Sequence, residues 1–242
     1  MLSKQKIKYF GIIPARKGSK SIIRKNLKPI LNKPLLQYTI EAAKSSKKLD
    51  YCILSSDDQD AIDLAIKNGI DAPFIRPSNL SDDNANSEEV VLHALQWFDK
   101  SHNESLKALV LLQPTTPFRT SEDIDNAIEK YENSGKDSLM SVCEVINHPS
   151  DCITINNNEE IEKVMPIQSP GNQRQNFKKV YFMDGSIYIT SVKRFRKKLN
   201  LYDKNTSLHL IPAFHGIDID EPFDLDLAKA IAFYSKNRRD LF

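Results

Sequence analysis

The chain has 242 residues, of which 40% are hydrophobic, so it is long enough for one large α/β domain and can bury a sizeable core, which excludes a disordered protein. Its net charge of only +2 argues against a nucleic-acid-binding protein. No apolar run approaches the roughly eighteen residues of a membrane helix, and the first residues show no secretory signal, so we expect a cytoplasmic protein with no membrane partner. The three cysteines lack metal-binding spacing, and the apolar runs around Cys52 and Cys143 predict buried, reduced thiols.

Charge is distributed unevenly along the chain. Residues 1–48 hold 13 Lys or Arg and a single acid, Glu41, whereas the rest of the chain holds 21 basic and 31 acidic residues. Such a distribution is often no more than a set of solvated faces. The alternative is that the basic end holds an anion and the acidic end holds a metal.

Strand and helix patterns alternate as far as Val145. Short apolar runs predict strands over residues 9–13, 51–55, 74–75 and 108–112. Helical spacing predicts helices over residues 35–47, 58–68, 88–98 and 120–133, the last of them opened by a capping box of Thr120 and Asp123. Beyond residue 180, strands are predicted over 185–190 and 208–213, and a closing helix over 224–236.

This alternation predicts the α/β class, as a three-layer α/β/α sandwich with a Rossmann-like, mixed and mostly parallel sheet. Residues 146–180 are polar and rich in Asn and Gln, which indicates an excursion from the sheet. We predict a single domain over residues 1–242, because the chain shows neither an internal repeat nor a linker. Ligands of such sheets bind at the carboxyl ends of strands, where the segments PARKGSK and QPTTPFR both fall.

The segment IIPARKGSKSIIRKN, residues 12–26, carries five cations on one loop: Arg16, Lys17, Lys20, Arg24 and Lys25. It is not a P-loop, because Ser19 separates Gly18 from Lys20, and its single glycine does not match the dinucleotide fingerprint. A triphosphate would match this number of positive charges, with Arg16 forking onto two oxygens and Asn26 adding an amide donor. A solvated basic loop is the alternative.

The segment GIDIDEPFDLD, residues 216–226, is acidic. Asp218 and Asp220 are two positions apart, so in an extended backbone both carboxylates point to one side and suit Mg²⁺. Acids before a helix are also favoured by its dipole, and Asp224 and Asp226 fit that alternative better. Arg174, in GNQRQNF, has uncharged neighbours that leave it free to bind a carboxylate, although an isolated arginine is usually a surface residue.

Four motifs in this order resemble the acylneuraminate cytidylyltransferases, or CMP-sialic acid synthetases. They are IPARKGSKSIIRKN at 13–26, LLQPTTPFR at 111–119, DGSIY at 184–188 and GIDID at 216–220. The resemblance implies a fold like that of the nucleotide-diphospho-sugar transferases. It also implies that the chain transfers CMP from CTP to the anomeric 2-hydroxyl of a nine-carbon 2-keto sugar acid, releasing pyrophosphate.

The resemblance also implies roles for single residues. The triphosphate would be held by Arg16, Ser19, Lys20, Lys25 and Asn26, and cytosine and ribose by Arg76, Ala85, Ser87 and Gln113. Asp218 and Asp220 would bind Mg²⁺, and catalysis would rest on Arg16, Lys20, Lys25 and Asp218. Arg174 and Tyr188 would contact the acceptor sugar, with Arg174 on its carboxylate. The excursion at about 146–180 would form a homodimer.

Two positions depart from the pattern of that family. Ser21 stands where a glycine is usual, and we expect the loop to tolerate it. Asp151 stands where enzymes that use N-acetylneuraminate tend to have a lysine, which favours legionaminic or pseudaminic acid as acceptor. A cytidylyltransferase for Kdo or another sugar acid, or a non-catalytic CTP- or RNA-binding protein, are the alternative readings of the same motifs.

Overall fold

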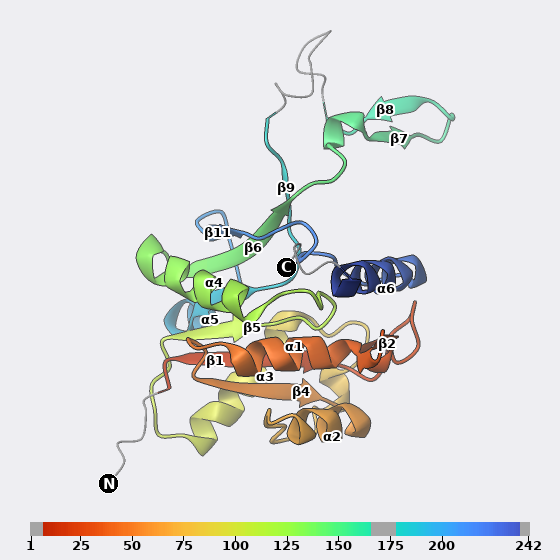
Figure 1. The fold of residues 1–242 in the computed structure, drawn as a ribbon. Coiled ribbons are helices and arrows are strands. Elements are labelled where there is room, and N and C mark those ends of the chain that lie inside the picture. The colour runs from red at the N-terminus through yellow and green to blue at the C-terminus, as the bar shows by residue number, and fades with distance from the viewer. Residues whose placement is uncertain (1–6, 166–177, 238–242) are drawn as a thin grey trace.

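The structure, a computed structural model, describes residues 7–165 and 178–237 and is built on a seven-stranded sheet (Figure 1). The strands of this sheet, in chain order, are β1 (Tyr9–Ala15), β4 (Tyr51–Ser56), β5 (Ala108–Leu111), β6 (Ser138–Glu144), β9 (Tyr181–Phe182), β10 (Tyr188–Ser191) and β11 (Ser207–Leu210). Their order across the sheet is β11–β6–β10–β5–β1–β4, with β9 paired to β6. The neighbours of β1 are parallel to it, β11 is parallel to β6, and β10 runs antiparallel to both β5 and β6.

Helices cover both faces of this sheet (Figure 1). They are α1 (Leu35–Ser45), α2 (Gln59–Lys67), α3 (Ser87–Ser101), α4 (Ser121–Ser134), α5 (Val192–Lys198) and α6 (Pro222–Asn237). The predicted three-layer sandwich with a mixed, mostly parallel sheet is therefore confirmed. The capping box at the start of α4 is confirmed as well, because Thr120 accepts a hydrogen bond from the Asp123 N–H and the Asp123 carboxylate accepts one from the Thr120 N–H.

Side chains that alternate along the strands divide the core between the two faces of the sheet. On β1, Ile13 packs into the cluster under α1, α2 and α4, whereas Phe10 and Ile12 pack under α3 and α5. Successive strand residues point to opposite faces, so a strand buried on both faces is apolar throughout. Cys52 and Cys143 are buried free thiols, as the sequence predicted.

A third, smaller core cluster joins the basic loop to the acidic segment. Ile22 and Leu35 pack there against Ile219 and against Leu225 of α6, and Ile219 is completely buried. Burial of these apolar side chains holds two segments together that lie about 200 positions apart in the chain. The segment around Asp218 and Asp220 is thereby fixed beside residues 16–26.

Two further small sheets and three 3₁₀ helices complete the described chain. They are the pair β2 (Pro29–Ile30) and β3 (Lys33–Pro34), the pair β7 (Ile153–Ile155) and β8 (Ile161–Lys163), and the 3₁₀ helices η1 (Lys25–Leu27), η2 (Ser78–Leu80) and η3 (Pro149–Asp151). The hairpin of β7 and β8 stands away from the main sheet, where the sequence predicted an excursion (Figure 1).

The strand predicted at residues 74–75 is wrong. Ile75 forms only an isolated bridge to Ser56, because the two prolines that flank this segment cannot donate ladder hydrogen bonds. Within residues 7–165 and 178–237, no helix is long and apolar enough to cross a membrane.

Candidate active site

A cavity of about 190 Å³ opens at the carboxyl ends of β1 and β5. Its wall brings together eight of the residues predicted from the sequence: Arg16, Ser19, Lys25, Asn26, Arg76, Ala85, Ser87 and Gln113. They come from three stretches of chain, the loop after β1, the segment that leads into α3, and the loop after β5. The cavity lies where ligands of parallel sheets bind.

The cations of the basic loop face carboxylates in this structure. Arg16 Nη1 lies 2.7 Å from Asp83 Oδ1, and Lys20 Nζ lies 3.0 Å from Asp83 Oδ2. Hydrogen bonds from Lys20 and then Arg16 hold the pKa of Asp83 below its ordinary range. Lys20 lines a second hollow, of about 340 Å³, which shares Arg16 and Ser19 with the cavity. Asp83 thus pairs with two cations that would also bind a phosphate group.

Lys25 connects the basic loop with the acidic segment. Its Nζ donates to the carbonyl oxygen of Ile219 at 2.7 Å and lies 3.0 Å from Asp220 Oδ1. The Lys25 side chain is mostly buried and the Asp220 side chain mostly exposed, so this carboxylate is held at the rim of the site. The predicted cations and the predicted acid pair therefore lie beside one another.

Arg76 is buried in the cavity wall, with one nitrogen that has no hydrogen-bond partner among the described residues. The guanidinium donates from Nε to Ser81 at 3.1 Å, and Nη2 is 3.7 Å from Asp57 Oδ1, outside hydrogen-bonding distance. Burial lowers the pKa of Arg76 from its ordinary value, and the charge of Asp57 partly offsets this. A buried donor without a partner is costly, so this nitrogen is available to a ligand in the cavity.

Asp218 supplies a carboxylate oxygen suited to a cation. Its Oδ1 is buried and makes no hydrogen bond to any described residue. Burial raises the pKa of Asp218, a hydrogen bond with Thr115 works against this, and the charge of Asp220 adds to the rise. The described residues contain no cluster of three or more metal-binding side chains. Mg²⁺ commonly takes one or two carboxylates together with substrate phosphates, and Asp218 with Asp220 fits that donor set.

Gln113, Gly185 and Asp218 meet at one point beside the cavity. Gly185 has a φ of +74°, and a Cβ there would lie 2.7 Å from Gln113 Oε1 and 3.8 Å from Asp218 Oδ2. The positive φ favours glycine at this position, and a side chain there would also displace the end of the Gln113 side chain. Tyr188 begins β10 three positions later and does not line the cavity; burial raises its pKa to about 12, and the charges of Asp184 and Asp218 contribute.

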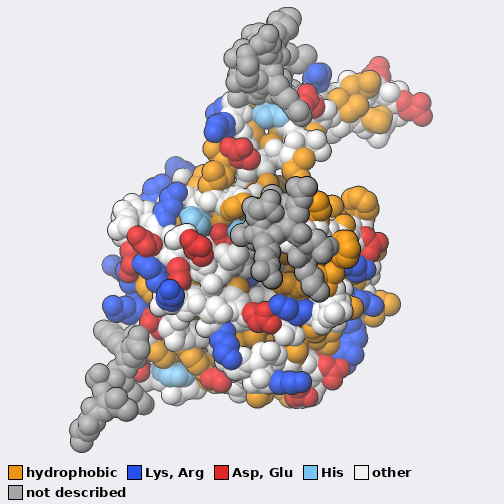
Figure 2. Space-filling view, viewed as in Figure 1, with side chains coloured by type: hydrophobic (Ala, Val, Ile, Leu, Met, Phe, Trp, Pro, Cys, Tyr) orange, Lys and Arg blue, Asp and Glu red, His pale blue; other side chains and the backbone are white. Residues whose placement is uncertain are grey.

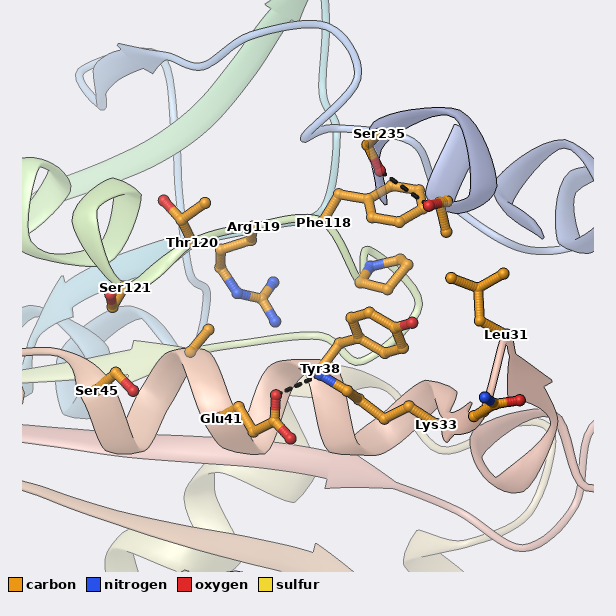
Figure 3. A pocket seen from close by; sticks show the side chains of 14 residues that line it. Leu31, Lys33, Tyr38, Glu41, Ser45, Phe118, Arg119, Thr120, Ser121 and Ser235 are labelled. Carbon is orange, nitrogen blue, oxygen red and sulfur yellow. Dashed lines mark hydrogen bonds and ion pairs between the residues drawn. The ribbon is translucent and has the colours of Figure 1, made fainter. Parts of the chain in front are cut away.

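The remaining predicted positions are placed differently. Arg174 lies outside the described residues. Ser21 donates a hydrogen bond to Glu221 at 2.9 Å, so the position where a glycine is usual also contacts the acidic segment. A larger hollow, of about 840 Å³, lies between α1, residues 117–121 and α6, and none of the predicted site residues lines it (Figure 3).

Sequence reasoning missed several residues of this site. Asp82, Asn86 and Thr115 line the cavity, and Asp83 pairs with its cations. The composition of RPSNLSDDNANS, residues 76–87, predicts only a loop. The sequence signal for this contact was the pair of adjacent acids in SDDNANS, which could have been expected to pair with the strongly basic loop. Their partners lie about 65 positions away, a pairing that local patterns do not contain.

Cations, a strand-end amide and paired carboxylates, gathered at the strand ends of an α/β sandwich, are the equipment of a nucleotidyltransferase. The family model described as cytidylyltransferase matches residues 10–231. The chain belongs to the cytidylyltransferase family and is a nucleotidyltransferase.

Relatives of the chain include three enzymes with named acceptors. It is 32% identical to a pseudaminic acid cytidylyltransferase of Campylobacter jejuni, over 98% of this chain and 100% of the relative. It is 31% identical to a CMP-N,N'-diacetyllegionaminic acid synthase of Legionella pneumophila, over 93% and 96%. It is 30% identical to an N-acylneuraminate cytidylyltransferase of Escherichia coli, over 97% of this chain and 54% of the relative.

Solved structures agree with the fold. A CMP:2-keto-3-deoxy-manno-octonic acid synthetase complexed with CTP superposes with a TM-score of 0.69 at 17% identity, over 94% of this chain and 99% of that one. The 4-diphosphocytidyl-2C-methyl-D-erythritol synthase of Anaerococcus prevotii superposes with a TM-score of 0.62 at 14% identity, over 93% and 98%.

Proposed function

We propose that the chain transfers CMP from CTP to the anomeric 2-hydroxyl of a nonulosonic acid of the sialic, legionaminic or pseudaminic type, giving the CMP-sugar and pyrophosphate. The observation that carries the proposal is the cavity at the ends of β1 and β5. Its wall combines the basic loop, Arg76 and Gln113, and Lys25 links it to Asp220. The cations that would bind a triphosphate and the acids that would bind a metal therefore lie at the same cavity.

The reaction forms a bond between the sugar oxygen and the α-phosphorus and breaks the bond from that phosphorus to the pyrophosphate oxygen. The hydroxyl proton is released. Phosphoryl and nucleotidyl transfers need little covalent chemistry from the protein, so positioning and charge dominate. Arg16, Lys20 and Lys25 hold the triphosphate and stabilise the charge that builds on pyrophosphate. Ser19 and Asn26 add neutral hydrogen-bond donors to the same loop.

The nucleoside is held by other residues of the cavity wall. Arg76 offers its unpartnered Nη2, and Gln113 offers a side-chain amide at the end of β5. Ala85 and Ser87 lie where α3 begins. The Ala85 N–H donates to Asp82 Oδ1 at 2.9 Å, whereas the N–H of Ser87, in the first turn of the helix, has no partner within the helix. These groups suit the carbonyl, amine and hydroxyl groups of cytidine.

Asp218 and Asp220 would hold Mg²⁺ as the cofactor. When bound, the ion neutralises phosphate oxygens and lowers the pKa of an attached hydroxyl. Within the protein, Lys25 Nζ lies 3.0 Å from Asp220 Oδ1, and the buried oxygen of Asp218 is left available to a cation.

The acceptor belongs to the nonulosonic acids because three relatives that match most of this chain are named for such acids. Asp151 is an anion where users of N-acetylneuraminate tend to have a lysine, which favours legionaminic or pseudaminic acid. Tyr188 and Arg174 are the acceptor contacts that we propose, with Arg174 on the carboxylate. We place the reaction in the cytoplasm, as the sequence led us to expect.

The proposed active form is a homodimer built on the hairpin of β7 and β8. Ile153, Ile155 and Ile161 share one face of this two-stranded ribbon and are exposed, and an isolated hairpin is marginally stable in water. Figure 2 shows hydrophobic side chains gathered on the projecting part of the chain. A second copy of the chain would cover them.

Pyrophosphate release tests the proposed function. The wild-type chain is incubated with CTP, Mg²⁺ and, in separate reactions, N-acetylneuraminic, legionaminic, pseudaminic and Kdo acids. We expect release with a nine-carbon acid, none without acceptor, and loss of activity in Asp218→Asn. The matched control is Asp226→Asn, which removes an exposed carboxylate of the same segment that pairs with Lys229.

Release with Kdo alone would identify a cytidylyltransferase for the eight-carbon acid and contradict the proposal. CTP binding without release on any acceptor would indicate a non-catalytic CTP-binding protein.

A further inference from the structure

Arg119 is a buried arginine at the end of the LLQPTTPFR segment, with only 2% of its surface exposed. Its partners are all carbonyl and hydroxyl oxygens, and no carboxylate of the described residues forms an ion pair with it. Burial lowers the pKa of Arg119 to about 10, while the charges of Asp123 and Asp184 work against this. A buried guanidinium without an ion pair is costly, and its Nε has no hydrogen-bond partner among the described residues, so the group depends on the bonds that Nη1 and Nη2 make.

Three segments of chain converge on this guanidinium. Nη1 donates to the carbonyl oxygen of Ser186 at 2.7 Å, and Nη2 donates to Thr39 Oγ1 of α1 at 2.6 Å. Both nitrogens lie 3.2 Å from the carbonyl oxygen of Gln113. Figure 3 shows Arg119 reaching from the loop after β5 toward α1.

Two of these segments carry the proposed substrate sites. Gln113 lines the nucleotide cavity, and Ser186 belongs to the turn that leads into Tyr188 on the acceptor side. Both backbone polar groups of Ser186 are bonded. Its N–H donates to Asp184 Oδ1 at 2.7 Å, and its carbonyl oxygen accepts from Arg119.

The two segments also meet through the Gln113 side chain. The backbone of Gly185 passes so close to Gln113 that a Cβ would lie 2.7 Å from its Oε1. A shift of the turn relative to the loop would therefore move the acceptor relative to the nucleotide. Without the guanidinium, the carbonyl oxygens of Gln113 and Ser186 would lose a shared donor.

We propose that Arg119 is a positioning residue that sets the distance between the nucleotide held at Gln113 and the acceptor held at the turn of residues 184–188. This inference rests on the proposed function and adds a residue that touches neither substrate. Arg119 governs the alignment of the sugar hydroxyl with the α-phosphorus, and it leaves CTP affinity to the residues of the cavity. Misplacement by about 1 Å can cost about 100-fold in rate.

The test separates kcat from CTP affinity in Arg119→Lys. A lysine keeps the charge but cannot reach the oxygens of three segments at once. We expect kcat to fall about 100-fold. The Kd for CTP, measured by calorimetry without acceptor, should stay within a factor of about three of the wild-type value, which is well below a tenfold change. Thr39→Val, which removes one partner of Arg119 on α1, should lower kcat less and also leave the Kd for CTP unchanged.

Arg194→Lys is the matched control for loss of a buried arginine. Arg194 is 6% exposed and bonds Thr190, Asn200 and Asp203, with none of the proposed site residues among them. We expect Arg194→Lys to lower Tm and to leave kcat unchanged. We expect Arg119→Lys to lower kcat even at temperatures where the variant is fully folded.

Chemical rescue adds a readout that a purely structural role would not move. Arg119 lines the open hollow of about 840 Å³ in Figure 3, so guanidinium ions can reach the space that Arg119→Ala leaves. We expect guanidinium at concentrations that do not unfold the wild type to restore part of kcat in Arg119→Ala, and not in Arg194→Ala.

Two outcomes would overturn the inference while the proposed function stands: a kcat for Arg119→Lys close to wild type, or parallel losses of kcat, CTP affinity and Tm without rescue. A wild-type chain that binds CTP but releases no pyrophosphate would overturn the proposed function, and this inference with it.

Discussion

Lys25 Nζ lies 3.0 Å from Asp220 Oδ1, although 195 positions separate the two residues in the chain. The contact joins the basic loop after β1 to the acidic segment before α6. It follows from the apolar cluster that packs Ile22 against Ile219, which brings both segments to one side of the sheet. A charge pair at this place is also a ready-made site for a phosphate and a cation, each of which would replace one partner of the pair.

Arg16→Ala should lower kcat by about 10² to 10³ at saturating CTP, because Arg16 supplies a fixed positive charge where pyrophosphate develops charge. Initial rates of pyrophosphate release over a range of CTP concentrations measure this effect. Lys17→Ala is the control, since Lys17 is an exposed cation of the same loop outside the cavity wall. Equal rates for Arg16→Ala and the wild type would remove Arg16 from the mechanism.

Asp83→Asn should tighten CTP binding. Asp83 pairs with Arg16 and Lys20, so its carboxylate competes with the triphosphate for both cations. Exposed ion pairs are weak and salt-dependent, so we expect the Kd for CTP to fall about two- to fivefold at low salt and less at high salt. Asp60→Asn, which removes a carboxylate paired with Arg24, should leave the Kd unchanged. Weaker binding in Asp83→Asn would mean that this carboxylate assists CTP.

Asp184→Asn should stabilise the protein at neutral pH. Burial raises the pKa of Asp184 above its ordinary 3.8, and Oδ2 has no partner among the described residues. The folded state therefore favours the neutral carboxyl, and the stability that this provides is present below about pH 3.8 and is lost as pH rises through the raised pKa.

An asparagine stays neutral and can still accept the Ser186 N–H. We therefore expect Tm to exceed that of the wild type by about 2 °C or more at pH 7, and the difference to vanish near pH 4. Thermal unfolding of both proteins from pH 4 to pH 8 measures this. A difference in Tm that does not change with pH would show that ionisation of Asp184 is not its cause.

Ile155→Glu should dissociate the homodimer that we propose. Ile155 pairs with Ile161 on the exposed face of the hairpin, and an ionised carboxylate there opposes burial against a second copy. Light scattering should give the mass of a dimer for the wild type and of a monomer for the variant. Thr154→Glu, on the opposite face of the same strand, should remain dimeric. A monomeric wild type would contradict the arrangement.

Local patterns in the sequence predicted much of the sheet and helix framework. The apolar run of β1, the helical spacing of α3 and the capping box of Thr120 are properties of neighbouring residues, and the structure contains all three. The position of β10 could not be predicted in this way. Its antiparallel insertion between β5 and β6 depends on pairing across the whole chain, as Ile189 with Val110 and with Leu139 illustrates.

For the site, the motifs predicted the residues that line the cavity but not the partners that hold them. Arg119 belongs to a recognised motif, yet only its buried position between Gln113 and Ser186 shows what it contacts. Asp83 likewise was one acid in a polar loop until the fold set it against Arg16. The contacts of Arg119 with Ser186 and of Asp83 with Arg16 each join residues 67 positions apart, and such contacts leave no periodicity in the sequence.

In the proposed mechanism, the cations of the basic loop and the acid pair before α6 hold one polyphosphate between them. A crystal structure of the chain with CTP and Mn²⁺ in place of Mg²⁺ tests it, because the anomalous signal locates the metal. We predict a single peak within ligand distance of Asp218 and Asp220 and of a CTP phosphate whose other oxygens contact Arg16 and Lys25. A triphosphate that contacts the loop with the metal elsewhere, or a peak at the acids with no phosphate beside it, would contradict the account.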